Sequence, residues 1–273
     1  TVDNNMAVGV AVADKPEGPY KDALGKPLIS TGSWSNIDPT VMIDDDGQAY
    51  LYWGNGSLYY VRLNQDMISY SDTITEVPQT EASFGGIRRR NNGNNASNSG
   101  GARPEPPKDV YVEGPWLFKR NSLYYLMYAG MTNRDECLSY ATATSPVGPW
   151  KYGGKIMTGQ PTNSFTNHGG IIDFKGNSYL FYHTGWLPGG GSYGRASSIE
   201  QFSFNPDGSM PAITATKTGV EPVATLNPYN HTEAETMAWS QKCSTAEMSG
   251  TGVYVTGTRT GGYIKVRAVD FGN

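Results

Sequence analysis

The stretch Asp109–Phe118, which reads Asp-Val-Tyr-Val-Glu-Gly-Pro-Trp-Leu-Phe, places one carboxylic acid, Glu113, among apolar residues that are typical of a strand. Such neighbours are expected to keep the carboxyl group partly out of water, which raises its pKa toward the range of a general acid. A lone glutamate at a strand start is more often a plain surface residue. The recurrence of the same pattern elsewhere in the chain favours the functional interpretation.

Three segments share one template, and they start at Asp38, Glu113 and His168. They read DPTVMIDDDGQAYLYWG, EGPWLFKRNSLYYLMYAG and HGGIIDFKGNSYLFYHTG. In each segment a polar residue opens an apolar strand, a turn rich in Gly, Asn or Asp follows, and a second strand is rich in aromatic residues. The opening residue lies 12, 11 and 11 positions before the first tyrosine of that second strand. This near-constant spacing predicts repeated structural units.

A second repeat relates residues 9–30 to residues 138–158, because both read as a short strand, a Pro/Gly turn and another strand. One complete unit then holds about four strands, which is the size of a propeller blade. The innermost strands of such blades surround a central axis. We therefore expect Asp38, Glu113 and His168 to face one another in one axial pocket.

Composition supports an all-β class. The 273 residues include 34 Gly, 17 Pro and 18 Tyr, and no amphipathic helical pattern is evident. The net charge of −4 gives no electrostatic footprint for nucleic acid, and no apolar run is long enough to cross a membrane. The cysteines, Cys137 and Cys243, have neither disulfide-framework nor metal-ligand spacing. The cluster Asp44–Gly47 suggests calcium at first sight, but a tight hairpin turn explains it better.

Pattern changes divide the chain into three parts. Residues 1–213 follow the propeller template, residues 214–230 read as a linker, and residues 231–273 contain alternating strands of a different kind that predict part of a β-sandwich. Within the first part, the polar stretch between Phe84 and Asp109 is expected to form a long surface loop near the pocket rim. Its arginines are Arg88, Arg89, Arg90 and Arg103.

Four motifs occur in the order found in glycoside hydrolase family 43, and the resemblance that they carry extends over nearly all of residues 7–211. They are IDPTV around Asp38, EGPW around Glu113, NHGGIIDF around His168 and GGGSYGRAS around Arg195. The chain resembles the arabinoxylan arabinofuranohydrolases and β-xylosidases of that family. The tail from Glu233 resembles the beginning of a family 6 carbohydrate-binding module. The resemblance implies a five-bladed β-propeller, with its first blade and part of its second outside this sequence, followed by an incomplete β-sandwich.

The resemblance also implies roles for single residues. Glu113 would be the general acid, and Asp38 would tune the pKa of that acid and orient it. Arg195 would reach toward the substrate, and His168 would lie at the propeller centre in contact with the substrate or with a structural calcium ion. The family inverts the anomeric carbon, so an aspartate general base is also required. No residue here matches that base, which we expect to precede Thr1.

Alternatives remain for each residue. Asp38 alone would suit an Asx turn at a strand entry, and His168 alone would suit a hydrogen-bonded core histidine. Trp53 and Trp116 stand near blade openings, where they would stack on a sugar ring, although tryptophans are also ordinary core residues.

Two functions from different classes fit these patterns. The first is an inverting glycosidase that releases arabinofuranose or xylose from arabinoxylan or xylan without a cofactor. The second is a non-catalytic sugar-binding propeller. The Asp38 and Glu113 pair favours the enzyme, because a lectin has no use for a desolvated acid. A plant cell-wall substrate predicts a secreted or cell-surface bacterial protein, although no signal peptide is visible in this sequence.

Overall fold

The computed structural model describes residues 5–272 except 17, 87–108, 133–134, 160–161, 188–189, 192 and 251. In this part of the chain, regular structure is almost entirely strand, and the one α-helix is the four-residue α1 (Glu81–Phe84). The all-β prediction is therefore confirmed. The predicted loop with Arg88, Arg89, Arg90 and Arg103 lies outside the described residues.

Antiparallel strands form two four-stranded sheets and one three-stranded sheet. The first contains β3 (Thr40–Ile43), β4 (Ala49–Trp53), β5 (Tyr59–Arg62) and β6 (Thr75–Glu76). The second contains β7 (Val110–Arg120), β8 (Leu123–Thr132), β9 (Asp135–Ala143) and β10 (Lys151–Thr158). The third contains β11 (Gly169–Phe174), β12 (Asn177–Thr184) and β13 (Ala196–Phe202).

Each copy of the sequence template forms an antiparallel hairpin, namely β3–β4, β7–β8 and β11–β12. The first tyrosine of the second strand is buried in all three copies, at Tyr50, Tyr124 and Tyr179. The second repeat is also present: β9 pairs with β10, and near the N-terminus β1 (Ala11–Val12) pairs with β2 (Lys21–Asp22). The repeated spacing in the sequence therefore corresponds to repeated structure.

The hydrophobic core is divided into three clusters that lie between neighbouring sheets. One joins β3–β6 to β7–β10 and contains Tyr52 and Tyr128. A second joins β7–β10 to β11–β13 and contains Met127 and Leu180. A third packs the N-terminal segment against β3–β6. Successive side chains of a strand point to opposite faces, so β8 supplies Tyr124, Leu126 and Tyr128 to one cluster and Tyr125 and Met127 to the next.

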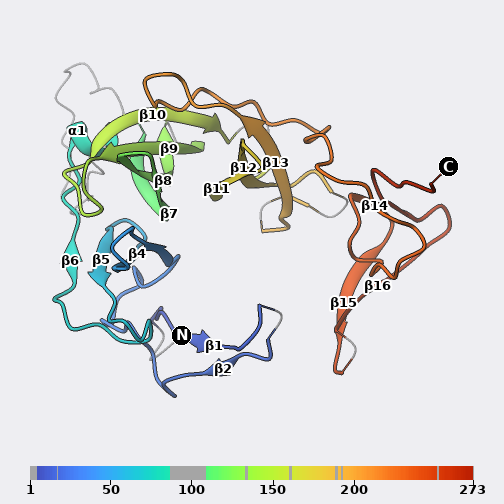
Figure 1. Cartoon of the computed structure of the whole chain (residues 1–273), viewed down its shortest axis with the longest axis horizontal. Coiled ribbons are helices and arrows are strands. Elements are labelled where there is room, and N and C mark those ends of the chain that lie inside the picture. Colours follow the sequence, from blue (N-terminus) through green and yellow to red (C-terminus); the bar gives the residue numbers. More distant parts are fainter. Residues whose placement is uncertain are drawn as a thin grey trace, which may run out of the picture.

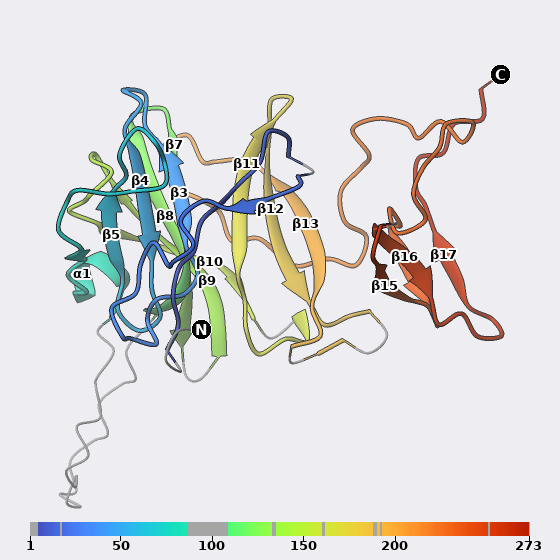
Figure 2. The same ribbon diagram turned by 90° about the horizontal axis from the view of Figure 1, so that it is seen from below.

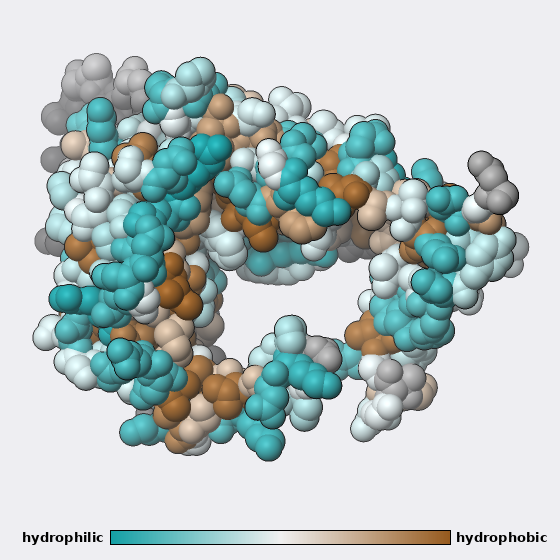
Figure 3. Space-filling model, viewed as in Figure 1, coloured by the Kyte–Doolittle hydropathy of each residue, from teal (hydrophilic) through white to brown (hydrophobic). Residues whose placement is uncertain are grey.

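The sheets stand side by side in an arc around a central open space (Figure 1). In the described residues the arc does not close, and the gap lies between the β1–β2 hairpin and β13. The space-filling view shows the same hollow, with sheets on its walls (Figure 3). The radial placement of repeated sheets agrees with a propeller, while the count of five blades stays a prediction.

Local hydrogen bonds form the turn between β3 and β4 and the cap of helix α1. Gly47 donates its backbone N–H to the Asp44 carbonyl, which closes the hairpin between β3 and β4, so the acidic cluster is a turn as predicted. Helix α1 was not anticipated from the sequence. Thr80 caps its N-terminus: the Thr80 side chain accepts the Ser83 N–H, and the Ser83 side chain accepts the Thr80 N–H.

The C-terminal strands lie apart from the three sheets (Figure 2). They form two separate pairs: β14 (Trp239–Gln241) with β17 (Tyr263–Lys265), and β15 (Ser244–Met248) with β16 (Gly252–Thr256). The predicted sandwich stays a prediction, because these pairs form two two-stranded sheets. The boundary expected after residue 213 lies inside a packed segment, since Thr216 still donates two hydrogen bonds to Glu200 on β13.

Candidate active site

Glu113 lies inside β7, at the fourth position of the strand, and not at its opening as the sequence template suggested. The pairing of β7 with β8 shifts register on both sides of Glu113, so the strand is bulged there. Bulges re-aim side chains and are common next to active sites. The neighbouring Gly114 has a φ of +59°, a conformation that glycine adopts without strain.

The start of β7 is fixed against the loop that follows β4. The Tyr111 hydroxyl donates to the Gly54 carbonyl at 2.7 Å, and the Gly56 N–H donates to the Val112 carbonyl at 2.7 Å. This attachment brings Asn55 to Glu113, where its side-chain amide donates to Glu113 Oε2. The second carboxylate oxygen, Oε1, lies 3.0 Å from His168 Nε2.

Asp38, Glu113 and His168 come together as the repeat predicted. One ligand atom from each lies within 4.8 Å of the other two. Asp38 precedes β3 in a left-handed conformation with a φ of +58°, which aspartate tolerates better than most residues. Its Oδ2 is buried and has no hydrogen-bond partner among the described residues.

The protonation of Glu113 differs from the prediction. The hydrogen bond from His168 lowers the pKa of Glu113, burial raises it, and the net shift is downward. The apolar neighbours in the sequence predicted the burial effect but not the histidine, which lies 55 residues away. Glu113 is therefore ionised more readily than an ordinary glutamic acid.

The pKa values of Asp38 and His168 shift upward, opposite to that of Glu113. Burial raises the pKa of Asp38, and the negative charge of Glu113 adds to this, against the effect of His168. Burial alone lowers the pKa of His168, but the bond to Glu113 and the charge of Asp38 raise it overall. The three groups thus influence one another, with the pKa values of His168 and Asp38 shifted upward and the pKa of Glu113 shifted downward.

Arg195 directly precedes β13 and is exposed. It lies close enough to the site for its positive charge to lower the pKa of Asp38, Glu113 and His183. Its contact with a ligand stays a prediction.

The two tryptophans predicted to bind sugar differ in their exposure. Trp116 is 38% exposed, its indole N–H donates to the Ile171 carbonyl at 3.2 Å, and it lines an apolar groove of about 450 Å³ beside His168 and Phe181. Trp53 is 0% exposed and stacks on Tyr59 in the core. Trp53 therefore has no free ring face, and the prediction that it binds sugar is wrong.

Three further residues of the site were not predicted. Asn55 follows the template glycine, which is the one signal that could have found it. Glu136 on β9 is buried, and its Oε2 accepts a hydrogen bond from the Asn167 N–H. His183 Nε2 accepts the N–H of His168 at 3.2 Å, and burial lowers the pKa of His183 to about 4. Burial raises the pKa of Glu136 to about 7, and the charge of Glu113 adds to this shift.

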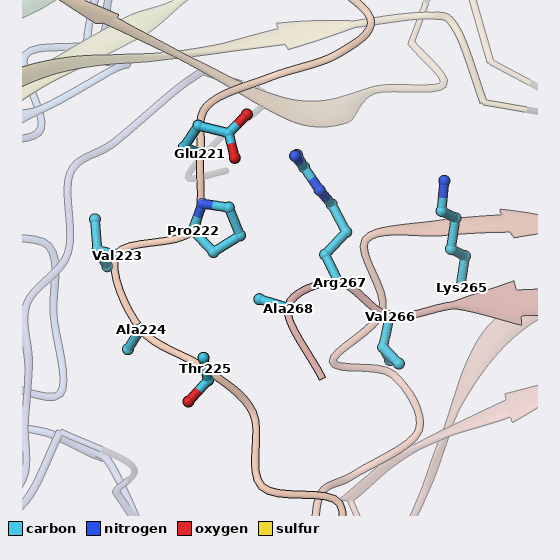
Figure 4. Close-up of a pocket in the computed structure, with 9 residues that line it drawn as sticks. All are labelled: Glu221, Pro222, Val223, Ala224, Thr225, Lys265, Val266, Arg267 and Ala268. Atoms are coloured by element: carbon cyan, nitrogen blue, oxygen red, sulfur yellow. The ribbon is translucent and has the colours of Figure 1, made fainter. Parts of the chain in front are cut away.

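A separate groove of about 560 Å³ lies in the C-terminal part. Figure 4 shows the side chains of Glu221, Arg267 and Lys265 projecting toward the same side of it. Arg267 donates to the carbonyls of Thr218 and Val220, so it ties the linker to the last strands. None of the residues that the sequence motifs single out lines this groove.

Repeated antiparallel sheets around a pocket with paired carboxyl groups define an all-β protein of the glycoside hydrolase class. The chain belongs to glycosyl hydrolases family 43, whose family model matches residues 1–210. The predicted family is therefore confirmed. Within the described residues, no helix has the length and apolar character to span a bilayer.

Individual relatives extend this result. The chain is 31% identical to the arabinoxylan arabinofuranohydrolase of Bacillus subtilis over 97% of this chain and 54% of the relative. It is 30% identical to the β-xylosidase of Xylanibacter ruminicola over 76% of this chain and 66% of the relative.

A crystal structure of the Bacillus subtilis arabinoxylan arabinofuranohydrolase with cellotetraose superimposes with a TM-score of 0.72 at 28% identity, covering 97% of this chain and 57% of that chain. The chain spans between 44% and 59% of the length of the first three curated relatives it matches.

Proposed function

We propose that this chain is the catalytic part of an inverting glycoside hydrolase that releases arabinofuranose or xylose from arabinoxylan-type hemicellulose. The observation that carries the proposal is the meeting of Asp38, Glu113 and His168 within 4.8 Å. Family membership and the substrates named for the relatives support it.

In this proposal Glu113 donates a proton to the leaving oxygen of the glycosidic bond. Asn55 and His168 hold its two carboxylate oxygens, so the group is oriented before the substrate arrives. Asp38 lies beside Glu113, and its negative charge favours the protonated form of the acid. An inverting enzyme also needs a carboxylate base on the opposite face of the sugar, and none of the matched motifs supplies one.

The contact with His168 must change during the reaction. While His168 bonds to Glu113 Oε1, it favours the ionised form of Glu113, which cannot donate a proton. A sugar oxygen that takes the place of the histidine contact would remove this effect and leave burial to raise the pKa. We therefore propose that substrate binding switches Glu113 to its acid form.

Arg195 and Trp116 are proposed to bind the substrate. The guanidinium at the rim can donate to sugar hydroxyls, and the exposed ring of Trp116 offers an apolar face beside the pocket. Their replacement by Ala should raise KM more than it lowers kcat. An unchanged KM in both variants would remove these residues from the binding site.

A structural calcium ion near His168 is a further proposal. Asp38 and His168 supply one carboxylate and one imidazole, far fewer than the six to eight oxygens that Ca²⁺ prefers, so water would complete the shell. Glu113 would not be a ligand, because a calcium-bound carboxylate is ionised and cannot donate the proton of the proposed reaction. No chemical step requires the ion. Elemental analysis of the wild type and of His168→Gln, both dialysed against the same buffer without chelator, tests the proposal: the wild type should contain calcium and the variant should contain less.

The C-terminal part is proposed to belong to a family 6 carbohydrate-binding module, with residues 214–230 as the linker. The paired strands β14–β17 and β15–β16 and the aromatic residues Trp239 and Tyr263 support this proposal. Because a plant cell-wall polysaccharide stays outside cells, we also propose that the protein acts in a secreted or cell-surface form. Detection of the protein in culture medium or surface fractions tests this location.

A second candidate is a sugar-binding propeller without catalysis. The lowered pKa of Glu113 favours it, because an ionised carboxylate accepts hydrogen bonds from sugar hydroxyls but donates no proton. The deciding experiment incubates the protein that contains this chain with arabinoxylan and with xylo-oligosaccharides and follows the anomeric protons by NMR. Release of arabinose or xylose with inverted configuration supports the enzyme. Retained binding without release of sugar supports the second candidate.

A further inference from the structure

A buried glutamate lies directly behind the candidate active site. Glu136 is 5% exposed, and its Oε2 accepts the backbone N–H of Asn167, the residue before His168. Neither the repeat nor the family motifs single out Glu136. The charges of Glu113, His168 and Arg195 all shift the pKa of Glu136, so this carboxyl group interacts electrostatically with the residues of the site.

The next amide along the chain is held in the same way. The His168 N–H donates to His183 Nε2 at 3.2 Å, so side chains from β9 and β12 hold two consecutive amides at the entry to β11. The Asn167 side chain is 0% exposed, and neither of its polar atoms has a hydrogen-bond partner in the described part of the chain. The bond to Glu136 is therefore the polar attachment of Asn167 in this structure. A buried amide without a partner costs free energy, so this bond fixes the path of the backbone.

The position of the Asn167–His168 backbone affects Glu113 because the His168 ring contacts the Glu113 carboxylate. The ring lies against Gly114, where a Cβ atom would stand 3.0 Å from Nδ1, so little room remains on that side. On its other side, Nε2 contacts Glu113 Oε1 at 3.0 Å. A shift of the Asn167 amide would therefore move the imidazole relative to the carboxylate.

We propose that Glu136 is a positioning residue that fixes the Asn167–His168 backbone and thereby the His168 imidazole against Glu113. Both the protonated and the ionised carboxyl group accept a hydrogen bond, so this role is filled in either state. The effect on turnover rests on the proposed function, whereas the placement of the His168 ring does not.

The kinetic test compares three variants of Glu136. Glu136→Leu keeps the size and removes the acceptor, and it should lower kcat by roughly 10- to 100-fold, because misplacements near 1 Å have effects of this order. KM should change little. Glu136→Gln keeps an acceptor oxygen and should retain kcat within about threefold. If Glu136→Leu does not fold, Glu136→Asp, which withdraws the acceptor by one methylene, gives the same comparison.

Glu200→Leu is the matched control. Glu200 on β13 is also buried and also accepts a backbone N–H, from Thr216, but it lies outside the site. Its loss should lower thermal stability and leave kcat within about twofold, as expected for a residue without a role in the site.

A spectroscopic test does not depend on activity. The chain has three histidines, so the ring nitrogens of ¹⁵N-histidine-labelled protein give few and assignable NMR signals. Glu136→Leu should shift the His168 signals and leave those of the exposed His231 unchanged, and Glu136→Gln should resemble the wild type. Unchanged His168 signals in Glu136→Leu would overturn the proposal, and so would equal losses of kcat in the Leu and Gln variants. A wild type without glycosidase activity would refute the proposed function, while the NMR comparison would still decide the role of Glu136.

Discussion

The chemistry proposed for this protein depends on the state of one carboxyl group. Glu113 is held by Asn55 on one oxygen and by His168 on the other. Burial and the histidine act on its pKa in opposite directions, and the histidine has the larger effect. Whether Glu113 donates a proton or only accepts hydrogen bonds is therefore a question about one contact, and substitutions at this contact distinguish the two candidate functions.

Replacing Glu113 with Gln keeps the shape and one acceptor oxygen but removes the transferable proton. Turnover of arabinoxylan should fall by roughly 10²–10⁴, the usual contribution of a placed acid, while binding survives. A nitrophenyl glycoside should lose less, because its leaving group needs little protonation. Steady-state kinetics on both substrates measure the difference.

The exposed Glu247→Gln on β15 serves as the control for the same chemical change and should behave as wild type. Equal losses on both substrates for Glu113→Gln would show that Glu113 is not the proton donor.

Asp38 is predicted to set the pH range of the reaction. Its negative charge raises the pKa of a neighbouring acid, so Asp38→Asn should lower the pKa of Glu113. A general acid works while protonated, and the alkaline limb of the pH–rate profile should therefore move to lower pH. Profiles of kcat/KM for wild type and variant test this. An alkaline limb that moves upward or stays in place contradicts the assignment.

At the scale of single elements, β7 is held in place by a buried acid at its start. Asp109 accepts hydrogen bonds from Thr132 and Tyr152, and its Oδ1 lies 2.9 Å from Lys155 Nζ. Burial raises the pKa of Asp109, but these hydrogen bonds outweigh burial and lower it overall. The cluster therefore joins β7 to β8 and β10 and fixes the strand that carries Glu113.

Asp109→Asn should lower the free energy of unfolding by about 2 kcal/mol near neutral pH, because it breaks a partly buried ion pair. A group with a lowered folded-state pKa stabilises the protein above its ordinary pKa, and this contribution is lost as the pH falls through the folded-state value. The difference between wild type and variant should therefore shrink toward pH 3. Urea unfolding at both pH values measures it.

Asp72→Asn is the comparison, since Asp72 pairs with Arg62 on the exposed surface at 2.6 Å. Exposed pairs contribute about 0–1 kcal/mol, so this variant should lose much less stability. If the two variants lose the same amount of stability, Asp109 does not have the structural role described here.

At the scale of the whole molecule, the core lies between sheets and not within one compact centre. Apolar side chains stay exposed on two sheets, including Ile43 on β3, Ile172 on β11 and Phe181 on β12. In contrast, Ser240 is the one buried residue among the described residues of 221–272. None of the three hydrophobic clusters contains a described residue of 221–272.

Ending the chain after Val220 is predicted to separate catalysis from polysaccharide binding. The shortened protein keeps the contacts of Ile213 and Thr216 with the sheets, so hydrolysis of an aryl glycoside should stay within about threefold. Binding to insoluble xylan should weaken by about tenfold or more, because a second binding element is lost.

A pull-down assay with insoluble xylan measures the binding, and steady-state kinetics on an aryl glycoside measure the hydrolysis. Ending the chain after Met210 provides the control, since it also removes the packed segment and should destabilise the sheets. A parallel loss of both activities in the Val220 truncation would show that the C-terminal strands support the site itself.

The sequence by itself determined the hairpins, their repetition and the residues that open them. Alternating apolar residues and Gly or Asp turns act over a few positions, so β3–β4, β7–β8 and β11–β12 follow from local pattern. Asp38, Glu113 and His168 occupy the same position in the three repeats. Their meeting at one site could therefore also be predicted.

Only the tertiary structure decided the environment of those residues. The burial of Trp53, the bond of His168 to Glu113 and the support from Glu136 and His183 depend on how separate sheets pack and on the register of their strands. Such contacts join positions far apart in the chain, where local pattern carries no information. A pKa responds to every charge and to burial, and so the same contacts, and not the apolar neighbours in the sequence, determine the protonation of Glu113.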